Sequence, residues 1–149
     1  MVTLEDMQTA LMKAHGEKTQ LQARLRMAAA ELVSCYRDSL GVPAEKSHRA
    51  VSTGVLRNDE FIAVPVASML LNKERQLQFY LSTTISDHHM SRFVVSLSIS
   101  MSEEHEFISV KVGDNVPALL VLKEGVEERF AESIEAIKQT VLEKIDYLA

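Results

Sequence analysis

The sequence predicts an α+β fold: an antiparallel meander sheet of about six strands, with a long N-terminal helix and a C-terminal helix packed on one face. Three patterns support this prediction. Residues 3–40 contain no proline and repeat apolar residues in a heptad rhythm, residues 50–123 alternate apolar and polar residues, and residues 126–148 return to helical spacing. Because 149 residues suit one hydrophobic core, we expect 1–149 to form a single domain.

The first helix is predicted over residues 3–40. Thr3 is a suitable N-cap with Asp6 three residues later, and Gly41-Val42-Pro43 supplies a stop signal. Apolar side chains recur at intervals of three and four residues, which is a heptad seam broken at Lys18. The seam consists of Leu4, Met7, Leu11, Ala14, Leu21, Leu25, Ala28, Leu32 and Cys35.

The two halves of this helix differ in their apolar faces. Up to Leu21 the seam is a narrow stripe, whereas from Leu25 to Leu40 additional apolar residues widen it into a core-facing surface. A continuous helix would be about 57 Å long, but a compact domain of this length is roughly 38 Å across. We therefore expect the first half to project beyond the domain.

A projecting narrow stripe is typical of a helix that pairs with a second copy. We expect self-association, as a homodimer, through Leu4, Met7, Leu11 and Leu21, with Lys18 favouring one oligomeric state. The alternative is a break at Gly16, after which both pieces would fold onto the same domain. The heptad phase is unchanged across Gly16, and this favours a continuous helix.

Strands are predicted between residues 50 and 123. In RFVVSLSISMS (92–102), apolar residues point to one face and serines to the other, which indicates a half-buried antiparallel strand. Pro65 cannot donate to a ladder, so its strand should bulge or lie at an edge. Most links are short, and the longest is 84–92. The other predicted strands are 50–56, 60–71, 76–82, 107–112 and 117–123.

The closing helix is predicted over residues 126–148, where apolar residues recur at intervals of three and four from Val126 to Leu148. Six strands make a sheet roughly 29 Å wide, which one helix of about 10 Å diameter cannot cover. We therefore expect the second half of the first helix to lie beside the closing helix on the same face of the sheet.

The opposite face of the sheet should carry small polar residues. An antiparallel sheet can leave one face in water, and this is the first interpretation of the serine row. The second is that the face receives a protein partner. Its candidate residues are Gln78, Tyr80, Ser96, Ser98 and Phe107.

Composition and charge argue against several classes of protein. The net charge is -5, and residues 1–50 carry seven basic against six acidic residues without a basic face, so nucleic acid is not an expected partner. No apolar run is long enough to span a membrane, and no membrane partner is expected. A single cysteine, Cys35, excludes an internal disulfide and is expected to be buried in the helical stripe. We expect a cytoplasmic protein.

No motif predicts catalysis or a cofactor. The serines lie in no nucleophile elbow and the five glycines form no phosphate-binding loop. The alternative is a small metal-binding protein or enzyme centred on Asp87-His88-His89, in which imidazoles and a carboxylate would meet in a loop. Adjacent loop side chains rarely converge on one ion, so we expect neither a metal nor a catalytic site there.

The resulting hypothesis is a non-enzymatic protein–protein interaction module that self-associates and binds another protein. In size, acidity and α+β make-up it is similar to small secretion chaperones and regulatory accessory proteins of bacteria or their phages, which is an analogy of class. That analogy implies a chaperone-like or regulatory role with one specific protein partner.

Overall fold

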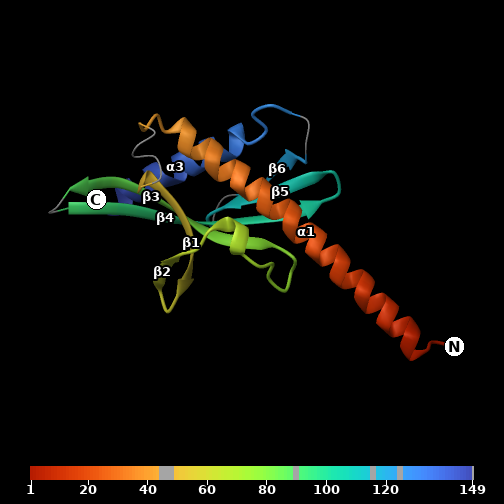
Figure 1. The fold of residues 1–149 in the computed structure, drawn as a ribbon. Coiled ribbons are helices and arrows are strands. Elements are labelled where there is room, and N and C mark those ends of the chain that lie inside the picture. Colours follow the sequence, from red (N-terminus) through yellow and green to blue (C-terminus); the bar gives the residue numbers. More distant parts are fainter. Residues whose placement is uncertain (44–48, 89–90, 115–116, 124–125, 149) are drawn as a thin grey trace.

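The computed structural model describes residues 1–43, 49–88, 91–114, 117–123 and 126–148. Two helices, α1 (Leu4–Ser39) and α3 (Ala131–Leu148), lie on one face of a six-stranded antiparallel sheet (Figure 1). The strands are β1 (Val51–Arg57), β2 (Glu60–Ala63), β3 (Leu77–His88), β4 (Ser91–Glu104), β5 (Phe107–Val112) and β6 (Leu119–Leu122). The predicted α+β fold is confirmed.

The sheet departs from a simple meander at one place. Its strand order is β2-β1-β3-β4-β5-β6, so β2 is an edge strand and the chain passes β1 again before it enters β3. The strand predicted over 60–71 ends at Ala63, because Pro65 precedes a short 3-10 helix, η1 (Val66–Ser68). Val66, Met69 and Leu71 are buried, so this connection packs as part of the core.

The β3–β4 hairpin is longer than predicted. The segment 84–92 was expected to be a loop, but its described residues, 84–88 and 91–92, continue both strands, with Asp87 opposite Arg92 and His88 opposite Ser91. The register shifts between Thr84 and Ser86, which is a bulge, and the alternation of faces changes there. A count of alternation alone therefore ended β3 too early.

The core lies between the two helices and one face of the sheet. The cross-strand pairs Leu77–Met101 and Phe79–Ile99 are buried on this face, and the intervening residues point to the other. The second half of α1 contributes Leu25, Ala28, Ala29, Leu32, Val33 and Tyr36, and the C-terminal segment contributes Phe130, Ile137 and Val141.

The closing helix begins later than the predicted residue 126. Glu128 has a φ of 58°, in the left-handed region, so residues 127–130 form a turn and α3 starts at Ala131. Val126 is consequently exposed and does not belong to the core stripe. Among the described residues, no helix is both long and apolar enough to cross a membrane.

Candidate functional site: two interaction surfaces

The first surface is the projecting half of α1, defined here as residues 4–20. It extends away from the sheet toward the N-terminus (Figure 1), and each of its residues is exposed. At 1.5 Å per residue its length is about 26 Å. Its side chains therefore contribute nothing to the core of their own chain.

Local interactions explain why this segment is helical without packing. The Thr3 hydroxyl accepts a hydrogen bond from the Asp6 N–H at 3.2 Å, and the Asp6 carboxylate accepts one from the Thr3 N–H at 2.9 Å, a complete capping box. The helix continues unbroken through Gly16 into its anchored half, which supplies the nucleus that an isolated helix would lack. The break at Gly16 is therefore not observed.

An apolar seam runs along one side of the projecting half. Leu4, Met7 and Leu11 are 69%, 59% and 58% exposed. At about 100° per residue, these three side chains lie within a sector of about 60°, and Leu25 and Leu32, which reach the core, lie within about 20° of its edge. The seam is thus the core-facing stripe of α1 continued beyond the sheet.

Leu21 belongs to the other half of the helix. It was predicted to contribute to self-association, but it is half-buried and packs against the core of its own chain. The boundary between projecting and anchored halves therefore lies at Leu21, and only one side of this residue remains available to a second molecule.

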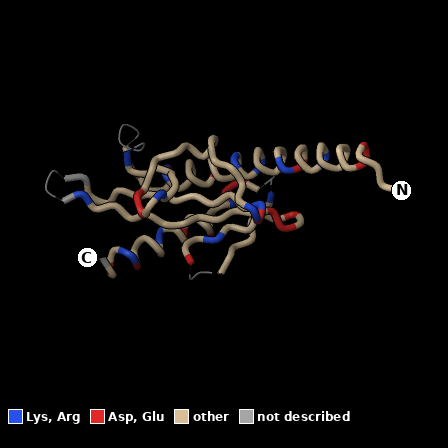
Figure 2. The backbone as a smooth tube through the Cα atoms, turned by 90° about the horizontal axis from the view of Figure 1, so that it is seen from below, with Lys and Arg blue, Asp and Glu red and all other residues tan. Residues whose placement is uncertain are grey.

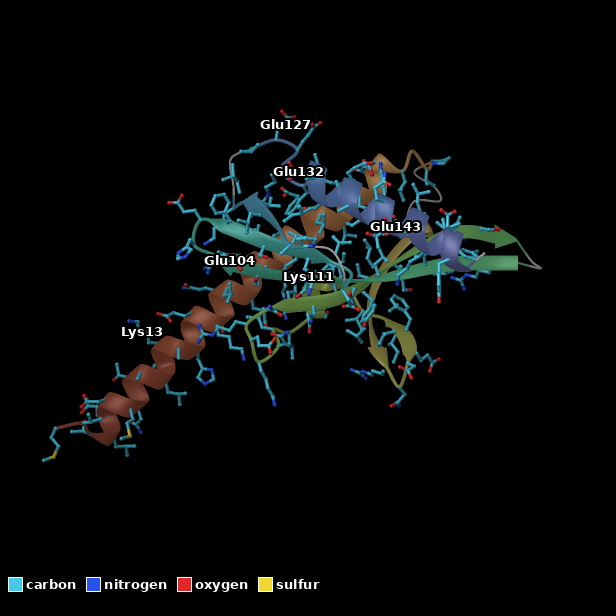
Figure 3. All side chains as sticks on the ribbon, turned by 180° about the vertical axis from the view of Figure 1, so that it is seen from behind. Lys13, Glu104, Lys111, Glu127, Glu132 and Glu143 are labelled. Atoms are coloured by element: carbon cyan, nitrogen blue, oxygen red, sulfur yellow. The ribbon has the colours of Figure 1, made fainter. Side chains whose placement is uncertain are left out.

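Polar and charged residues occupy most of the remaining sides of the projecting half. Two acidic residues lie in its first turn, and charges of both signs lie nearer the body (Figure 2). Lys13 extends from this half far from Lys111 on the sheet (Figure 3). Met12 is 75% exposed and lies outside the seam sector. Lys18 lies within the seam, so it interrupts the apolar stripe between Ala14 and Leu21.

Polar contacts hold the base of the projecting half in a defined direction. Arg24 makes a bidentate pair with Glu103 at 2.8 and 2.9 Å, and Lys123 lies 3.5 Å from the same carboxylate. The hydrogen bond from Arg24 lowers the pKa of Glu103 and raises that of Arg24. Sequence reasoning could not find this pair, because a partner 79 residues away leaves no local signal.

Two further contacts fix the same region. The Arg26 guanidinium donates to the Met69 carbonyl at 2.7 Å, and the Leu71 N–H donates to the Gln22 side-chain carbonyl at 3.1 Å. The segment after η1 therefore braces α1 where the helix leaves the body. The exposed side chain of Leu70 lies beside this contact.

The second surface is the outer face of the sheet, on the side away from the helices. The predicted residues Gln78, Tyr80, Ser96 and Ser98 all point to it, as the cross-strand pairs Tyr80–Ser98 and Ser82–Ser96 require. Ser96 and Ser82 hydrogen bond to each other at 3.2 Å, and Gln78 accepts from Asn72 at 3.1 Å. The serine row is thus a hydrogen-bonded surface.

This outer face is hollowed. A cavity of about 400 Å³ contacts Gln78, Tyr80 and Lys111, and another of about 570 Å³ contacts Ser82, Ser96 and the ring of Phe61. The β1–β2 hairpin supplies one wall of each. A Cβ at Gly54 would overlap the carbonyl oxygen of Ile62, so this hairpin closes tightly only with glycine there.

An apolar cluster lies at the edge of the outer face. Phe107, which was predicted for the partner face, is paired with Leu122, and Leu120 lies two residues from Leu122 on the same side of β6. All three are exposed large apolar side chains. Sequence reasoning missed the two leucines, because a run of four apolar residues (LLVL) does not reveal which of them are exposed.

The Asp87-His88-His89 hypothesis falls largely outside the described residues. The backbone of Asp87 and His88 lies in β3 and not in a loop, and His89 is not described. His105 is exposed in the β4–β5 turn with a φ of 55°. In the part of the chain that the structure describes, no three potential metal ligands gather.

Cys35 was predicted to be buried, and this prediction is wrong. The thiol is exposed at the rim of a cavity of about 630 Å³ between α1 and residues 126–134, because the core sector of α1 turns away from the heptad position of Cys35. Partial desolvation, and then the carboxylates of Glu31 and Asp38, raise the pKa of this thiol. Glu31 also binds Arg129 at 2.6 Å, which joins α1 across the cavity to the turn that precedes α3.

Comparisons with protein-family models, with curated proteins and with solved structures gave no match. What the protein does is therefore inferred from its own two surfaces.

Proposed function

We propose that this protein is a non-enzymatic protein–protein interaction module that self-associates through the projecting half of α1. The observation that carries the proposal is the exposed seam of Leu4, Met7 and Leu11 on a helix that extends past its own sheet. A second copy offers the same seam, so a symmetric pair would bury both at once.

The width of the seam indicates the kind of partner. Helices that pack on a globular core bury a broad face, as the anchored half of α1 does, whereas paired helices bury a narrow stripe at alternating spacings of three and four residues. The projecting half has only the narrow stripe. Most helix stability in proteins comes from packing, so an unpacked segment with a regular apolar stripe gains stability when another helix covers it.

Single substitutions of adjacent residues test the self-association. Leu11→Gln places an amide in the seam, and Met12→Gln makes a similar change at the next residue but outside the seam. Because burying one leucine contributes about 1.5–3 kcal/mol, Leu11→Gln should raise the dimer dissociation constant by at least about tenfold. Met12→Gln should leave it unchanged. The measurement is sedimentation equilibrium over a range of protein concentrations.

Two results would contradict the proposal. One is a wild-type protein that remains monomeric at every concentration, and the other is a dimer that Leu11→Gln and Met12→Gln weaken equally. Circular dichroism of both variants should match the wild type, since each altered side chain is exposed and makes no core contact.

We further propose that the outer face of the sheet receives the other protein that such a module would bind. Two features support this proposal: the cluster of Phe107, Leu120 and Leu122 at one edge, and two cavities on the same face whose linings include hydroxyl, amide and charged groups. Apolar anchors beside satisfied polar groups are the usual composition of a protein interface. The serine row is assigned no catalytic role, because Ser82 and Ser96 bond to each other.

A further inference from the structure

We infer that two copies pair with their α1 helices antiparallel, so that the free end of each projecting half contacts the base of the other. This inference rests on the proposed self-association and specifies its geometry. Two features support it, the side-chain sizes along the seam and the position of Lys18, and the length of the overlap is compatible with it.

Side-chain sizes fit an antiparallel pair. When the seam of one copy runs against the reversed seam of the other, Leu4 faces Leu21, Met7 faces Lys18, and Leu11 faces Ala14. At Leu11–Ala14 a large side chain meets a small one, so the layer fills without overlap or void. A parallel pair would instead place Ala14 against Ala14 and leave a thin layer in the middle of the seam.

The position of Lys18 favours the same orientation. In a parallel pair the two Lys18 ammonium groups would share one layer, and like charges at this distance repel. In the antiparallel pair the methylene groups of Lys18 pack on Met7 of the other copy, while its ammonium extends to solvent. The two Lys18 residues then lie in different layers, so their charges are no longer adjacent.

The length over which the two antiparallel helices overlap is compatible with the length of the projecting half. The projecting half begins at Leu4 and ends where Leu21 enters the core, so antiparallel overlap of Leu4 with Leu21 covers the whole projecting half and stops at the body. One side of the half-buried Leu21 then contacts its own core, and the other side contacts the second copy.

The free end of each helix then reaches an apolar site at the base of the other. Met1 and Val2 of one copy come beside Gln22 of the other, where the Gln22 side chain binds the Leu71 N–H and Leu70 is 73% exposed. Exposed apolar residues at the tip and at the base thus become complementary. The Arg24–Glu103 pair holds the base in place for this contact.

Disulfide trapping tests the orientation in the full-length protein. The exposed Cys35 is first replaced by serine, so that each variant carries one cysteine, and Met7→Cys and Lys18→Cys are then made separately. In an antiparallel pair, position 7 faces position 18, whereas identical positions lie about 16 Å apart along the helix axis. A disulfide needs Cα atoms within about 7 Å, so only the mixture of the two variants should form covalent dimers.

The expected result is a mixed covalent dimer at least about tenfold more abundant than either homodimer, because geometry sets disulfide formation. Mass spectrometry of the oxidised mixture measures it, and Leu4→Cys with Leu21→Cys repeats the test one layer away. Covalent homodimers of Met7→Cys or Lys18→Cys would overturn the antiparallel orientation and leave self-association standing. A dimer by sedimentation without any trapped product would also overturn the inference.

If the wild-type protein sediments as a monomer under reducing conditions, the proposed self-association is contradicted. Failure of the proposed function can therefore be distinguished from failure of the antiparallel orientation. Each reduced variant should fold as the wild type does, with the same circular dichroism spectrum, before it is oxidised. Met7 and Lys18 are both exposed, so neither substitution removes a core contact.

Discussion

At the scale of single residues, Tyr36 connects the N-terminal helix to the sheet. Its ring is buried in the core, and its hydroxyl lies 2.8 Å from the hydroxyl oxygen of Thr83 on β3. Both groups lie out of solvent, so each depends on the other for a hydrogen bond. Burial raises the pKa of the Tyr36 phenol, and the hydrogen bond to Thr83 partly offsets that shift.

This pair predicts how stability changes at high pH. Because the pKa of folded Tyr36 is raised above the unfolded value of about 10, its contribution to stability is complete below pH 10 and is lost as pH rises through the folded pKa. Tyr36→Phe should reduce the free energy of unfolding by about 1 kcal/mol near neutral pH. It should also flatten the decline above pH 10.

The control for that measurement is Tyr147→Phe, which removes an exposed phenol from α3. Urea unfolding at several pH values compares the two variants with the wild type. Parallel declines above pH 10 for the wild type and Tyr36→Phe would show that Tyr36 is not the group responsible.

At the scale of elements, α1 is one helix in two environments. Its heptad seam keeps the same phase from Leu4 to Leu32, yet Leu11 is 58% exposed and Leu32 is fully buried. The difference comes from what lies opposite each residue. The sheet and α3 cover the second half, whereas the projecting half has passed the end of the sheet (Figure 1).

Leucine-to-alanine substitutions in the two halves of α1 measure how much each half contributes to the stability of the monomer. Leu32→Ala removes a buried side chain and should destabilise the folded monomer by about 2–5 kcal/mol. Leu11→Ala should change the free energy of unfolding by less than about 0.5 kcal/mol, provided that both are unfolded in urea at concentrations where the protein is monomeric. Equal destabilisation would mean that the projecting half folds back onto its own domain.

At the scale of the whole molecule, the two surfaces are separated by the sheet. The seam follows the side of α1 that also faces the core, whereas Phe107, Leu120 and Leu122 lie on the outer face. A second copy bound along the projecting half therefore leaves the outer face open. Self-association and partner binding are expected to respond to different substitutions.

Leu120 and Leu142 provide a matched pair for this expectation, since both leucines are 54% exposed. Leu120→Ser alters the outer face, and Leu142→Ser alters α3. In affinity purification from the native host, Leu120→Ser should lose a partner protein that wild type and Leu142→Ser both retain. Sedimentation should give all three the same mass. Retention of the partner by Leu120→Ser would exclude this face as its binding surface.

Most of the fold could be predicted from local patterns, and the errors have local causes. Alternation in 92–102 identified a half-buried strand because side-chain direction repeats every two residues. Three local features each interrupt such a period: the bulge near Ile85, the 3-10 turn after Pro65 and the left-handed conformation of Glu128. A period shows where an element exists, but not the residue at which it ends.

The properties of the two candidate surfaces also divide into those that the sequence predicts and those that tertiary packing decides. The amino-acid pattern alone specifies a capped heptad helix longer than its domain and a sheet with one polar face, because these properties depend on neighbours within a few residues. Long-range packing set the rest: β2 outside β1, Leu21 partly buried against the core, Cys35 exposed, and Leu120 and Leu122 uncovered. Whether an apolar side chain is buried depends on which distant element lies opposite it, and no local repeat encodes that.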